Sequence, residues 1–426
     1  MPVTVVVGAQ WGDEGKGRIV DWLARRADMV IRYQGGDNAG HTVVNDAGRF
    51  ALHMVPSGIF NPETTCIVGA GTVVSPDGLL KEIESLEQAN VSTRGLLLDE
   101  RAHVVLPTHR HLDGLQEEAR KGDARIGTTR RGIGPAYADK AARTGLRLGD
   151  LVRPATLAAK VDRALDRLNP QIEALGGAPE EAEALVRQLK LWGEALGDRI
   201  GDTLPIMYGC LDSGRSILLE GQLGGMRDLD WGTWPYVTSS NTVAGAAAVG
   251  SGLPPRAIER VIGVMKAYCT AVGAGPFPTE EHGDTGDRLR AFGQEYGATT
   301  GRPRRCGWFD AVALRQAARL SGFTHLALTK LDVLAGFEHL RVGVGYTLDG
   351  RAIDHVPWPE DYARVEAVYE EHEGWQSAVS RARTWEELPL KARTYVHRLA
   401  ELAGNIPLAF TSVGPARDQL IVQDWP

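Results

Sequence analysis

Asp13 and His41 are the residues whose types and surroundings best fit acid–base chemistry. Asp13 belongs to a glycine-rich segment, GAQWGDEGKGR from Gly8 to Arg18, and His41 ends a second one, QGGDNAGH, which starts at Gln34. A carboxylate in a phosphate-type loop is repelled by phosphate unless it holds a metal ion or takes a proton. A carboxylate and a nearby imidazole can take a proton from a base and support charge on a phosphoryl group. We therefore take Asp13 and His41 as a candidate catalytic pair.

The first glycine-rich segment lies between a predicted strand and a predicted helix. The β-branched run Val3 to Val7 is typical of a strand buried on both faces. From Lys16 onward, apolar residues recur at helical spacing: Ile19, Val20, Leu23 and Ala24. Free N–H groups and the helix dipole favour an anion at such a junction, so we predict a phosphate site, with a solvated turn as the alternative. The segment matches neither of the common glycine fingerprints of nucleotide-binding proteins.

Two long motifs and several shorter ones carry a resemblance to a known family. The stretch QWGDEGKG at Gln10 to Gly17 and the stretch GIGPAYADKAAR at Gly132 to Arg143 resemble the two signatures of the adenylosuccinate synthetase family. The resemblance continues through YQGGDNAGHT, YVTSSNT, VGAGPFPTE, ATTGRPRR and TKLDVL, and so covers nearly the whole chain.

The resemblance implies a GTP-dependent ligase that joins L-aspartate to the 6-position of IMP and forms adenylosuccinate, GDP and phosphate. It implies that Asp13 removes the N1 proton of the purine and that the 6-oxygen then attacks the γ-phosphate of GTP. His41 would stabilise the charge, and Lys140 would add positive charge nearby as a third catalytic residue. The aspartate amine would then displace the 6-phosphoryl group.

The resemblance also implies the ligand-binding residues. The IMP site would contain Asp13, Glu14, Gly15, Lys16, Asn38, Ala39, Gly40, His41, Thr129, Arg143, Leu223, Thr238 and Arg302. The GTP site would contain Gly12, Asp13, Glu14, Gly15, Lys16, Gly17, Arg18, Gly40, His41, Thr42, Arg304, Lys330, Leu331, Asp332, Ser412, Val413 and Gly414. The aspartate site would contain Ala298, Thr299, Thr300, Gly301, Arg302, Pro303 and Arg304, and one Mg²⁺ would bind Asp13 and the carbonyl of Gly40.

Two of these segments have a physical rationale of their own. The loop ATTGRPRR, which ends at Arg305, carries three arginines, and guanidinium groups bind carboxylates at two points, which suits the two acid groups of aspartate. As a bare charge cluster it is also compatible with a solvated loop. In TKLD, the carboxylate of Asp332 after a strand can accept both N1–H and 2-amino hydrogens of guanine.

The pattern of apolar runs and glycine turns predicts an α/β fold. We expect a large, mostly parallel central sheet with flanking helices, similar to nucleotide hydrolases, in a single domain over residues 1–426. A helical excursion is expected at about 150–200 and a peripheral layer at about 340–405. We further expect Met29–Tyr33 to pair beside the first strand, Asp123–Gly149 to be an irregular basic loop, and Pro254–Cys269 to be a helix.

Composition narrows the function classes. The chain has 426 residues, with 47 Lys and Arg against 54 Asp and Glu, and its net charge of −7 argues against non-specific nucleic-acid binding. No apolar run approaches the length of a membrane span, so we expect a cytoplasmic protein without membrane contact. Four scattered cysteines suggest reduced thiols rather than disulfides or zinc. The resemblance implies a homodimer in which Arg143 reaches the partner's nucleotide site.

Four positions depart from the family pattern as we expect it. Leu223 stands where the turn after the strand carries glutamine, and Asp37, Arg130 and Trp231 also differ from it. Since all four were expected near the purine, an alternative is the same chemistry on GMP or dGMP, which gives a 2-amino-adenylosuccinate. A GTP-binding switch protein is the alternative from another class, although it needs neither an amino-acid clamp nor an acid–base pair.

Overall fold

A long, twisted sheet forms the centre of the molecule. The structure is a computed structural model that describes residues 3–38, 40–122, 125–297, 301–423 and 425. In this described part the sheet has ten strands, in the order β20 (Leu420–Val422), β19 (Leu408–Ser412), β15 (His325–Thr329), β11 (Ile258–Lys266), β1 (Val3–Gly8), β10 (Ile217–Gly224), β2 (Met29–Arg32), β5 (Thr65–Val68), β7 (Leu96–Asp99) and β9 (Ile200–Gly201). All neighbours are parallel except β19 and β20, which confirms the predicted α/β class.

Helices cover both faces of this sheet. Val5 and Val7 of β1 belong to one apolar core, and Val6 between them belongs to the other, because successive side chains of a strand point to opposite faces. The first core is closed by α11 (Ala311–Ser321) and α13 (Leu390–Leu402), and the second by α1 (Lys16–Ala24) and α2 (Pro76–Gln88). Burial on both faces explains why the central strands are almost uniformly apolar.

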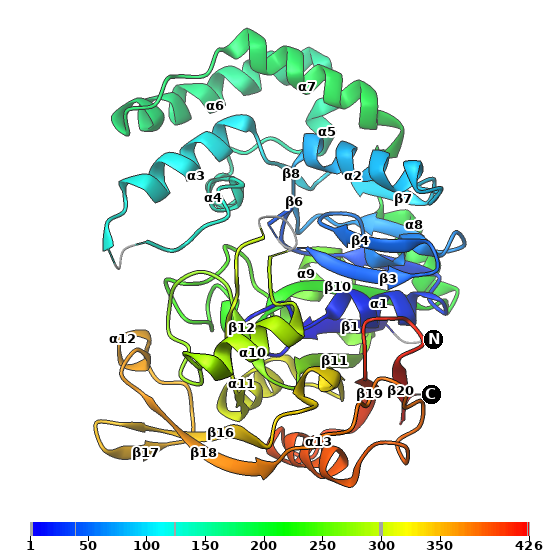
Figure 1. Cartoon of the computed structure of the whole chain (residues 1–426). Helices are drawn as coiled ribbons and strands as arrows, with labels where there is room; N and C mark the ends of the chain where they lie inside the picture. Colours follow the sequence, from blue (N-terminus) through cyan, green and yellow to red (C-terminus); the bar gives the residue numbers. More distant parts are fainter. Residues whose placement is uncertain (1–2, 39, 123–124, 298–300, 424, 426) are drawn as a thin grey trace.

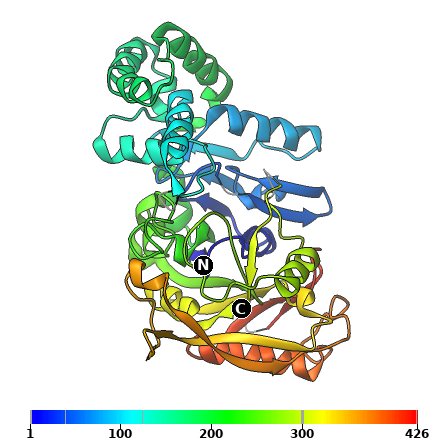
Figure 2. The ribbon, with the colours of Figure 1, turned by 60° about the vertical axis from the view of Figure 1, so that its left-hand side comes forward.

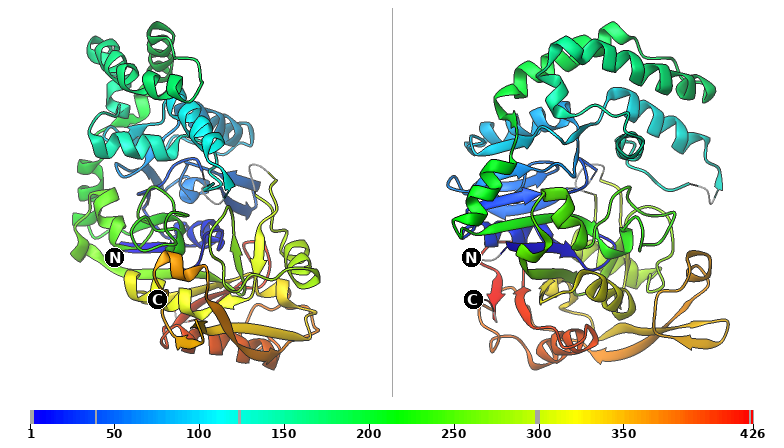
Figure 3. Two further views of the ribbon diagram at one scale, coloured as in Figure 1. Left: turned by 90° about the vertical axis from the view of Figure 1, so that its left-hand side faces the viewer. Right: turned by 180° about the vertical axis from the view of Figure 1, so that it is seen from behind.

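A group of helices lies at one end of the molecule (Figures 1 and 3). It consists of α3 (Pro107–Ala119), α4 (Ile133–Ala142), α5 (Leu148–Leu151), α6 (Pro154–Ala174) and α7 (Ala182–Leu196). The predicted apolar stripe of α6 is buried at Leu157, Val161, Leu165 and Leu168, and α6 and α7 occupy most of residues 150–200.

A smaller sheet lies at the opposite end (Figure 2). It contains β14 (Phe309–Asp310), β16 (His339–Leu348), β17 (Arg351–Ile353) and β18 (Glu366–Glu373), with β16 and β18 antiparallel. The other elements are short: β3 (His41–Asn45) with β4 (Gly48–Leu52), β6 (Val73–Val74) with β8 (His103–Val104), β12 (Cys269–Ala271) with β13 (Arg305–Gly307), α8 (Leu204–Asp212), α9 (Gly245–Ser251), α10 (Asp284–Gly293), α12 (Pro359–Tyr362), and the 3-10 turns η1 (Ser57–Phe60), η3 (Gly197–Arg199), η4 (Gly225–Arg227), η5 (Pro255–Ala257) and η6 (Leu331–Leu334).

Three local predictions are wrong. The strand at Met29–Tyr33 does not lie beside β1, because β10 is inserted between β1 and β2. The segment Pro254–Cys269 is not a helix: most of it is β11, whose apolar residues fit either period. The basic segment Asp123–Gly149 is not wholly irregular, since α4 lies within it and α5 begins at its end, at Leu148.

Within the described residues, no helix combines the length and the apolar character that crossing a membrane requires. The four cysteines all lie in described segments, and each is free and buried.

Candidate active site

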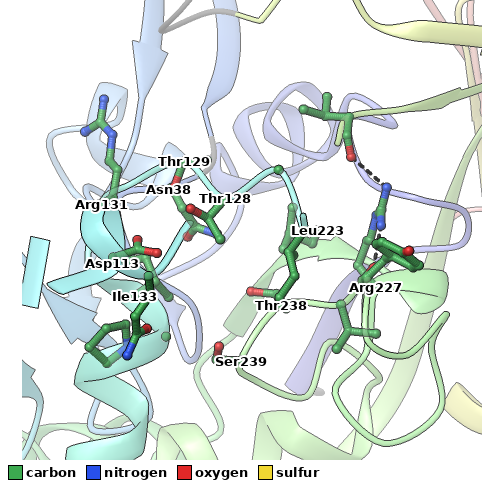
Figure 4. A pocket seen from close by; sticks show the side chains of 18 of the residues that line it. Asn38, Asp113, Thr128, Thr129, Arg131, Ile133, Leu223, Arg227, Thr238 and Ser239 are labelled. Carbon is green, nitrogen blue, oxygen red and sulfur yellow. Dashed lines mark hydrogen bonds between the residues drawn. The ribbon is translucent and has the colours of Figure 1, made fainter. Parts of the chain in front are cut away.

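A cavity of about 470 Å³ opens beside the carboxyl ends of β1, β2 and β10. Figure 4 shows Asn38, Thr129, Leu223 and Thr238 converging on it from different segments, with Arg131 at its side. Ligands of parallel α/β sheets usually bind at this edge, because the loops that follow neighbouring strands meet there.

Part of the predicted site lines this cavity. Its lining includes Asp13, Asn38, Gly40, Thr129, Leu223, Thr238 and Arg304 from the prediction, and also Asp113, Arg131 and Arg227, which the sequence analysis did not select. Glu14, Gly15 and Lys16 continue the loop from Asp13, and His41 and Thr42 begin β3 next to Gly40. The predicted residues Ala39, Ala298, Thr299 and Thr300 lie outside the described residues.

The glycine loop is organised around a buried carboxylate. Glu14 accepts hydrogen bonds from the backbone N–H groups of Gly12 at 2.8 Å and Gln10 at 3.0 Å, and from Lys16 Nζ at 2.6 Å. Gly15, with φ of 86°, precedes α1 in the left-handed conformation that glycine adopts without strain. Since Glu14 engages Lys16 and two loop amides, a phosphate group must replace these bonds before those donors can hold it.

His41 is held by a second buried carboxylate, that of Glu220. Glu220 Oε1 lies 2.5 Å from His41 Nδ1, and the carboxylate also accepts from Ser57 N at 2.8 Å and Ser57 Oγ at 2.6 Å. Burial raises the pKa of Glu220, but His41, Arg32 and Ser57 outweigh it and bring the pKa to about 2. The carboxylate is therefore ionised, accepts a hydrogen bond from Nδ1–H and fixes the orientation of the ring.

The other nitrogen of this imidazole is available for chemistry. His41 Nε2 is buried and has no hydrogen-bond partner among the described residues. Burial, together with the charge of Arg32, lowers the pKa of His41, although Glu220 opposes the shift. A buried polar atom without a partner is costly, so Nε2 is suited to meet a ligand group. Gly17 permits this arrangement, because a Cβ at that position would lie 2.8 Å from His41 Cβ.

Asp13 faces Arg304. The Asp13 carboxylate lies 2.9 Å from Arg304 Nε, and Arg304 Nη1 lies 2.5 Å from the buried carboxylate of Glu295. Asp13 has φ of 59° and remains partly exposed at the cavity wall. The structure thus brings the predicted base and one arginine of the predicted aspartate loop into direct contact. Gly301, Arg302 and Pro303 precede Arg304 in this loop and do not line the cavity.

The predicted guanine turn follows β15 and contacts the glycine loop. Thr329 Oγ1 donates to the carbonyl of Glu14 at 2.6 Å, and Lys330 follows in the left-handed conformation with φ of 61°. Burial raises the pKa of Asp332, which stands with Leu331 in η6.

Arg18 ties the C-terminal loop to the same region. Its Nη1 donates to Ser412 Oγ and the Gly414 carbonyl, and its Nη2 donates to the Ala416 carbonyl at 2.6 Å. Ser412, Val413 and Gly414 are therefore held close to the first turn of α1. The segments predicted for GTP thus come together in space.

Lys140 and Arg143 do not join this cavity within one chain. Ile133, Gly134 and Ala138 of α4 line the first cavity, whereas Lys140 and Arg143 line a second one of about 500 Å³. Lys140 Nζ donates to the Ala70 carbonyl at 3.0 Å, and burial, with the charge of Arg147, lowers its pKa to about 8.

The four departures from the family pattern do not all line this cavity. Leu223 lines the cavity, with φ of 61°. Asp37 is buried and lies 3.0 Å from Arg131 Nη1. Arg130 is exposed and pairs with Glu118 at 2.8 Å on the outer surface. Trp231 is also exposed and is not part of the cavity lining. Arg130 and Trp231 therefore do not line this cavity, whereas Leu223 does.

Gln222 does not take the place of the missing glutamine in this structure. Its Oε1 accepts from Arg32 Nη2 at 2.9 Å, and its Nε2 donates to Asn38 Oδ1 at 2.7 Å. Both ends of the amide are therefore engaged, and the side chain is buried. The cavity wall at position 223 therefore presents the apolar side chain of Leu223.

The donors near Asp13 suit a hard cation with few protein ligands. Mg²⁺ commonly takes one or two carboxylates and completes its shell with water and phosphate oxygens. One partly exposed carboxylate, Asp13, and the nearby backbone at Gly40 fit that need. Within the described ranges, no cluster of three or more His, Cys, Asp or Glu side chains forms a ready-made metal cage.

Comparison with known proteins agrees with this geometry. A family model for adenylosuccinate synthetase matches residues 5–421. The chain belongs to the adenylosuccinate synthetase family. Adenylosuccinate synthetases of a Nostoc species and of Heliobacterium modesticaldum are 49% and 48% identical to it, over 100% and 99% of this chain and 95% and 99% of theirs.

Solved structures agree on the fold. The fully ligated adenylosuccinate synthetase of Plasmodium falciparum aligns over 100% of both chains with a TM-score of 0.92 and 35% identity. A cyanophage S-2L succinoaminodeoxyadenylate synthetase, bound to dGMP and dATP, aligns over 99% of this chain and 95% of its own with a TM-score of 0.63. At 21% identity, that second likeness concerns the fold alone.

Sequence reasoning missed the carboxylates that hold the site together. Glu220 lies in β10, directly after a run of apolar residues and before the glycines of the sequence EGQLGG, which was a usable signal for it. Glu295 precedes the arginine loop with no pattern around it, and only the three-dimensional contacts reveal it.

Proposed function

We propose that this chain ligates L-aspartate to IMP at the expense of GTP, giving adenylosuccinate, GDP and phosphate. The observation that carries the proposal is the pairing of two groups. Asp13 faces the cavity, and His41 is fixed by Glu220, while its Nε2 has no partner among the residues that the structure describes. A GTP-binding switch needs neither group, so we set that alternative aside.

The residues have complementary tasks in this reaction. Asp13 accepts the N1 proton of IMP, and the 6-oxygen attacks the γ-phosphorus of GTP while the bond to GDP breaks. His41 donates a hydrogen bond from Nε2 to the transferred phosphoryl group, whose oxygens can only accept, while Nδ1 donates to Glu220, which holds the ring and supports its positive charge. The amine of aspartate then attacks C6, the amine loses a proton, and the 6-oxygen leaves with the phosphoryl group as phosphate.

We assign a Mg²⁺ ion to Asp13 and the carbonyl of Gly40. The ion would neutralise charge on the phosphate oxygens of GTP when bound. Arg304 must release Asp13 for this role, and a carboxylate of the substrate aspartate is a suitable new partner for its guanidinium group.

The nucleotide contacts follow the geometry described above. Lys330 and Asp332 are proposed to bind guanine, with Arg18 holding the loop at Ser412 to Gly414 against it. Asn38, Thr129 and Thr238 are proposed to bind IMP in the cavity, and Gly301 to Arg304 to bind aspartate.

We also propose that the enzyme is a homodimer in which Arg143 reaches the partner's IMP. Its support is the position of Lys140 and Arg143 in a second cavity with Arg147 and Arg153, which suits an anion. Mixing Asp13→Asn with Arg143→Ala should restore about a quarter of wild-type activity, because half of the dimers are mixed and each keeps one intact site. Two variants that stay inactive after mixing would contradict the shared site.

Free, buried cysteines support a reducing, cytoplasmic setting.

The decisive experiment measures phosphate release with GTP, Mg²⁺ and L-aspartate, with IMP, GMP or dGMP supplied in parallel and products identified by mass. We expect turnover with IMP that requires aspartate. Release that is independent of aspartate would favour a GTPase, and no release would overturn the ligase proposal.

The same chemistry on GMP or dGMP is the second candidate, and Leu223 is the observation that favours it. Leu223 offers no hydrogen bond to a purine, and Gln222 is held by Arg32 and Asn38. If turnover occurs with a guanine nucleotide only, the substrate assignment changes and the mechanism stays. In that case Leu223→Gln should move preference towards IMP, whereas the surface variant Trp231→His should leave preference unchanged.

A further inference from the structure

Glu295 lies at a junction of segments that come from distant parts of the chain. It follows α10 and is fully buried. Its Oε1 lies 3.1 Å from Lys266 Nζ at the end of β11 and accepts from Tyr268 Oη at 2.5 Å. Its Oε2 lies 2.5 Å from Arg304 Nη1, and Lys330 Nζ lies 3.9 Å from Oε1. One carboxylate therefore faces three cationic side chains.

The charges around Glu295 are unbalanced without it. Burial raises the pKa of Glu295, but Lys266, Lys330 and Arg304 outweigh burial and bring its pKa to about 2. The carboxylate is thus ionised at any working pH. Removing its charge would leave three like charges close together in a buried space, where repulsion is weakly screened.

Two of these cations belong to different proposed substrate sites. Arg304 also contacts Asp13 at 2.9 Å, and it ends the loop proposed to bind aspartate. Lys330 also donates to the Gly293 carbonyl at 2.6 Å, and it opens the turn proposed to bind guanine. Glu295 is the group that both side chains share.

We infer that Glu295 is a positioning residue that couples the aspartate loop to the guanine turn, by holding Arg304 and Lys330 on one carboxylate. The inference rests on the proposed function, because it uses the substrates assigned to those two segments. Glu295 contacts neither substrate: it sets the direction in which each cation points.

The coupling gives a specific kinetic signature. When aspartate binds, Arg304 turns from Asp13 towards the new carboxylate but keeps its second bond to Glu295. The position of Lys330 then depends on the same anchor. Loss of the anchor should weaken the binding of aspartate and of GTP together. The binding of IMP should be spared, because its proposed contacts Asn38, Thr129 and Thr238 come from other segments of the cavity lining.

The test compares steady-state kinetics of the full-length wild type with Glu295→Gln, which keeps the size and removes the charge. We expect the KM values for aspartate and for GTP each to rise roughly tenfold, as for loss of a charge-assisted contact. The KM for IMP should change less than twofold, and the preference for GTP over ATP should fall. A purely structural role would affect all three substrates alike.

Glu280→Gln is the matched control. Glu280 pairs with the neighbouring arginine of the same loop, with Arg305 Nε at 2.9 Å from its carboxylate, and has no contact with Lys330. We expect this variant to leave the KM for GTP and the preference over ATP unchanged. If Glu295→Gln fails to fold, Tyr268→Phe removes one donor from the same carboxylate and should raise both KM values in the same direction, by less.

The outcomes are distinguishable. A wild type without aspartate-dependent turnover overturns the proposed function itself. If the wild type is active, three results would overturn the coupling. They are a Glu295→Gln or Tyr268→Phe variant in which one KM value alone changes, one in which all three KM values change equally, and one in which none changes. The coupling is supported if the KM values for aspartate and for GTP rise in parallel while the KM for IMP stays unchanged. Glu280→Gln must also leave the KM for GTP unchanged.

Discussion

Replacing Glu220 by glutamine tests the central feature of the site, the fixed imidazole of His41. Glu220 accepts three hydrogen bonds, from His41 Nδ1 at 2.5 Å, Ser57 N at 2.8 Å and Ser57 Oγ at 2.6 Å. A glutamine side chain has one acceptor oxygen and an amide group that can only donate. If the oxygen serves Ser57, the amide faces Nδ1 and forces the proton onto Nε2.

The size of the effect follows from the bonds lost. A hydrogen bond to a charged group contributes about 1.5 to 3 kcal/mol, and each ~1.4 kcal/mol is tenfold in rate, so kcat should fall roughly 10- to 100-fold. The KM values for IMP, GTP and aspartate should change little, because Glu220 is not expected to touch any of them. The assay is phosphate release under saturating substrates, with thermal unfolding followed by circular dichroism.

Glu82→Gln is the matched control for damage to the buried interior. Glu82 is also buried and accepts from the backbone N–H groups of His53 at 2.8 Å, Met54 at 2.9 Å and Val55 at 3.2 Å, but does not contact His41. It should lose stability with little loss of kcat. A Glu220→Gln variant with wild-type kcat, or one no slower than Glu82→Gln, would refute the assigned role of Glu220.

Three further predictions concern stability and binding. Gly17→Ala places a Cβ 2.8 Å from His41 Cβ, so it should destabilise the fold by about 1–3 kcal/mol and lower kcat. The control is Gly209→Ala in α8, where the added Cβ meets open space. In thermal unfolding experiments this variant should be as stable as the wild type or more stable. Arg18→Ala frees the loop after β19 and should raise the KM for GTP about tenfold with the KM for aspartate unchanged; equal changes in both would contradict this. The Glu295 carboxyl has a pKa of about 2 in the folded state against an ordinary value of 4.5, so its contribution is present above pH 4.5 and is lost as pH falls towards 2. That contribution to the free energy of unfolding is roughly 3 kcal/mol. In urea titrations between pH 5 and pH 2.5, the free energy of unfolding of Glu295→Gln should therefore fall less steeply with pH than that of the wild type. An equal slope in the two proteins would argue against the ion-pair network.

The strands and the main loops could be predicted because their signals are local. The run Val3 to Val7 has no polar interruption, and the glycines that follow it permit only a tight turn before α1. The α6 stripe has a clear helical period. Where the period was ambiguous, as in Ile258–Lys266, local pattern failed, because a fully buried strand and a buried helix present similar apolar runs.

Helix α4 shows how tertiary contacts override composition. Its sequence is rich in small residues and lacks a strong apolar stripe, so it was expected to belong to a loop. In the fold, Tyr137 Oη binds the Gly35 N–H at 2.9 Å and donates to the Gly71 carbonyl at 3.0 Å, and Asp139 lies 3.0 Å from His109 Nε2. These long-range bonds stabilise a helix that propensity alone does not predict.

The sequence by itself determined the fold class and the family, and it selected the groups proposed to carry the chemistry, since motifs such as the one around Asp13 are contiguous in the chain. Only the tertiary structure decided which carboxylates hold those groups. Glu220 lies 179 residues from His41, and Lys266 lies 29 residues from Glu295. Contacts between such distant positions depend on the order of strands in the sheet, and that order is set by packing across the whole molecule, which no local pattern encodes.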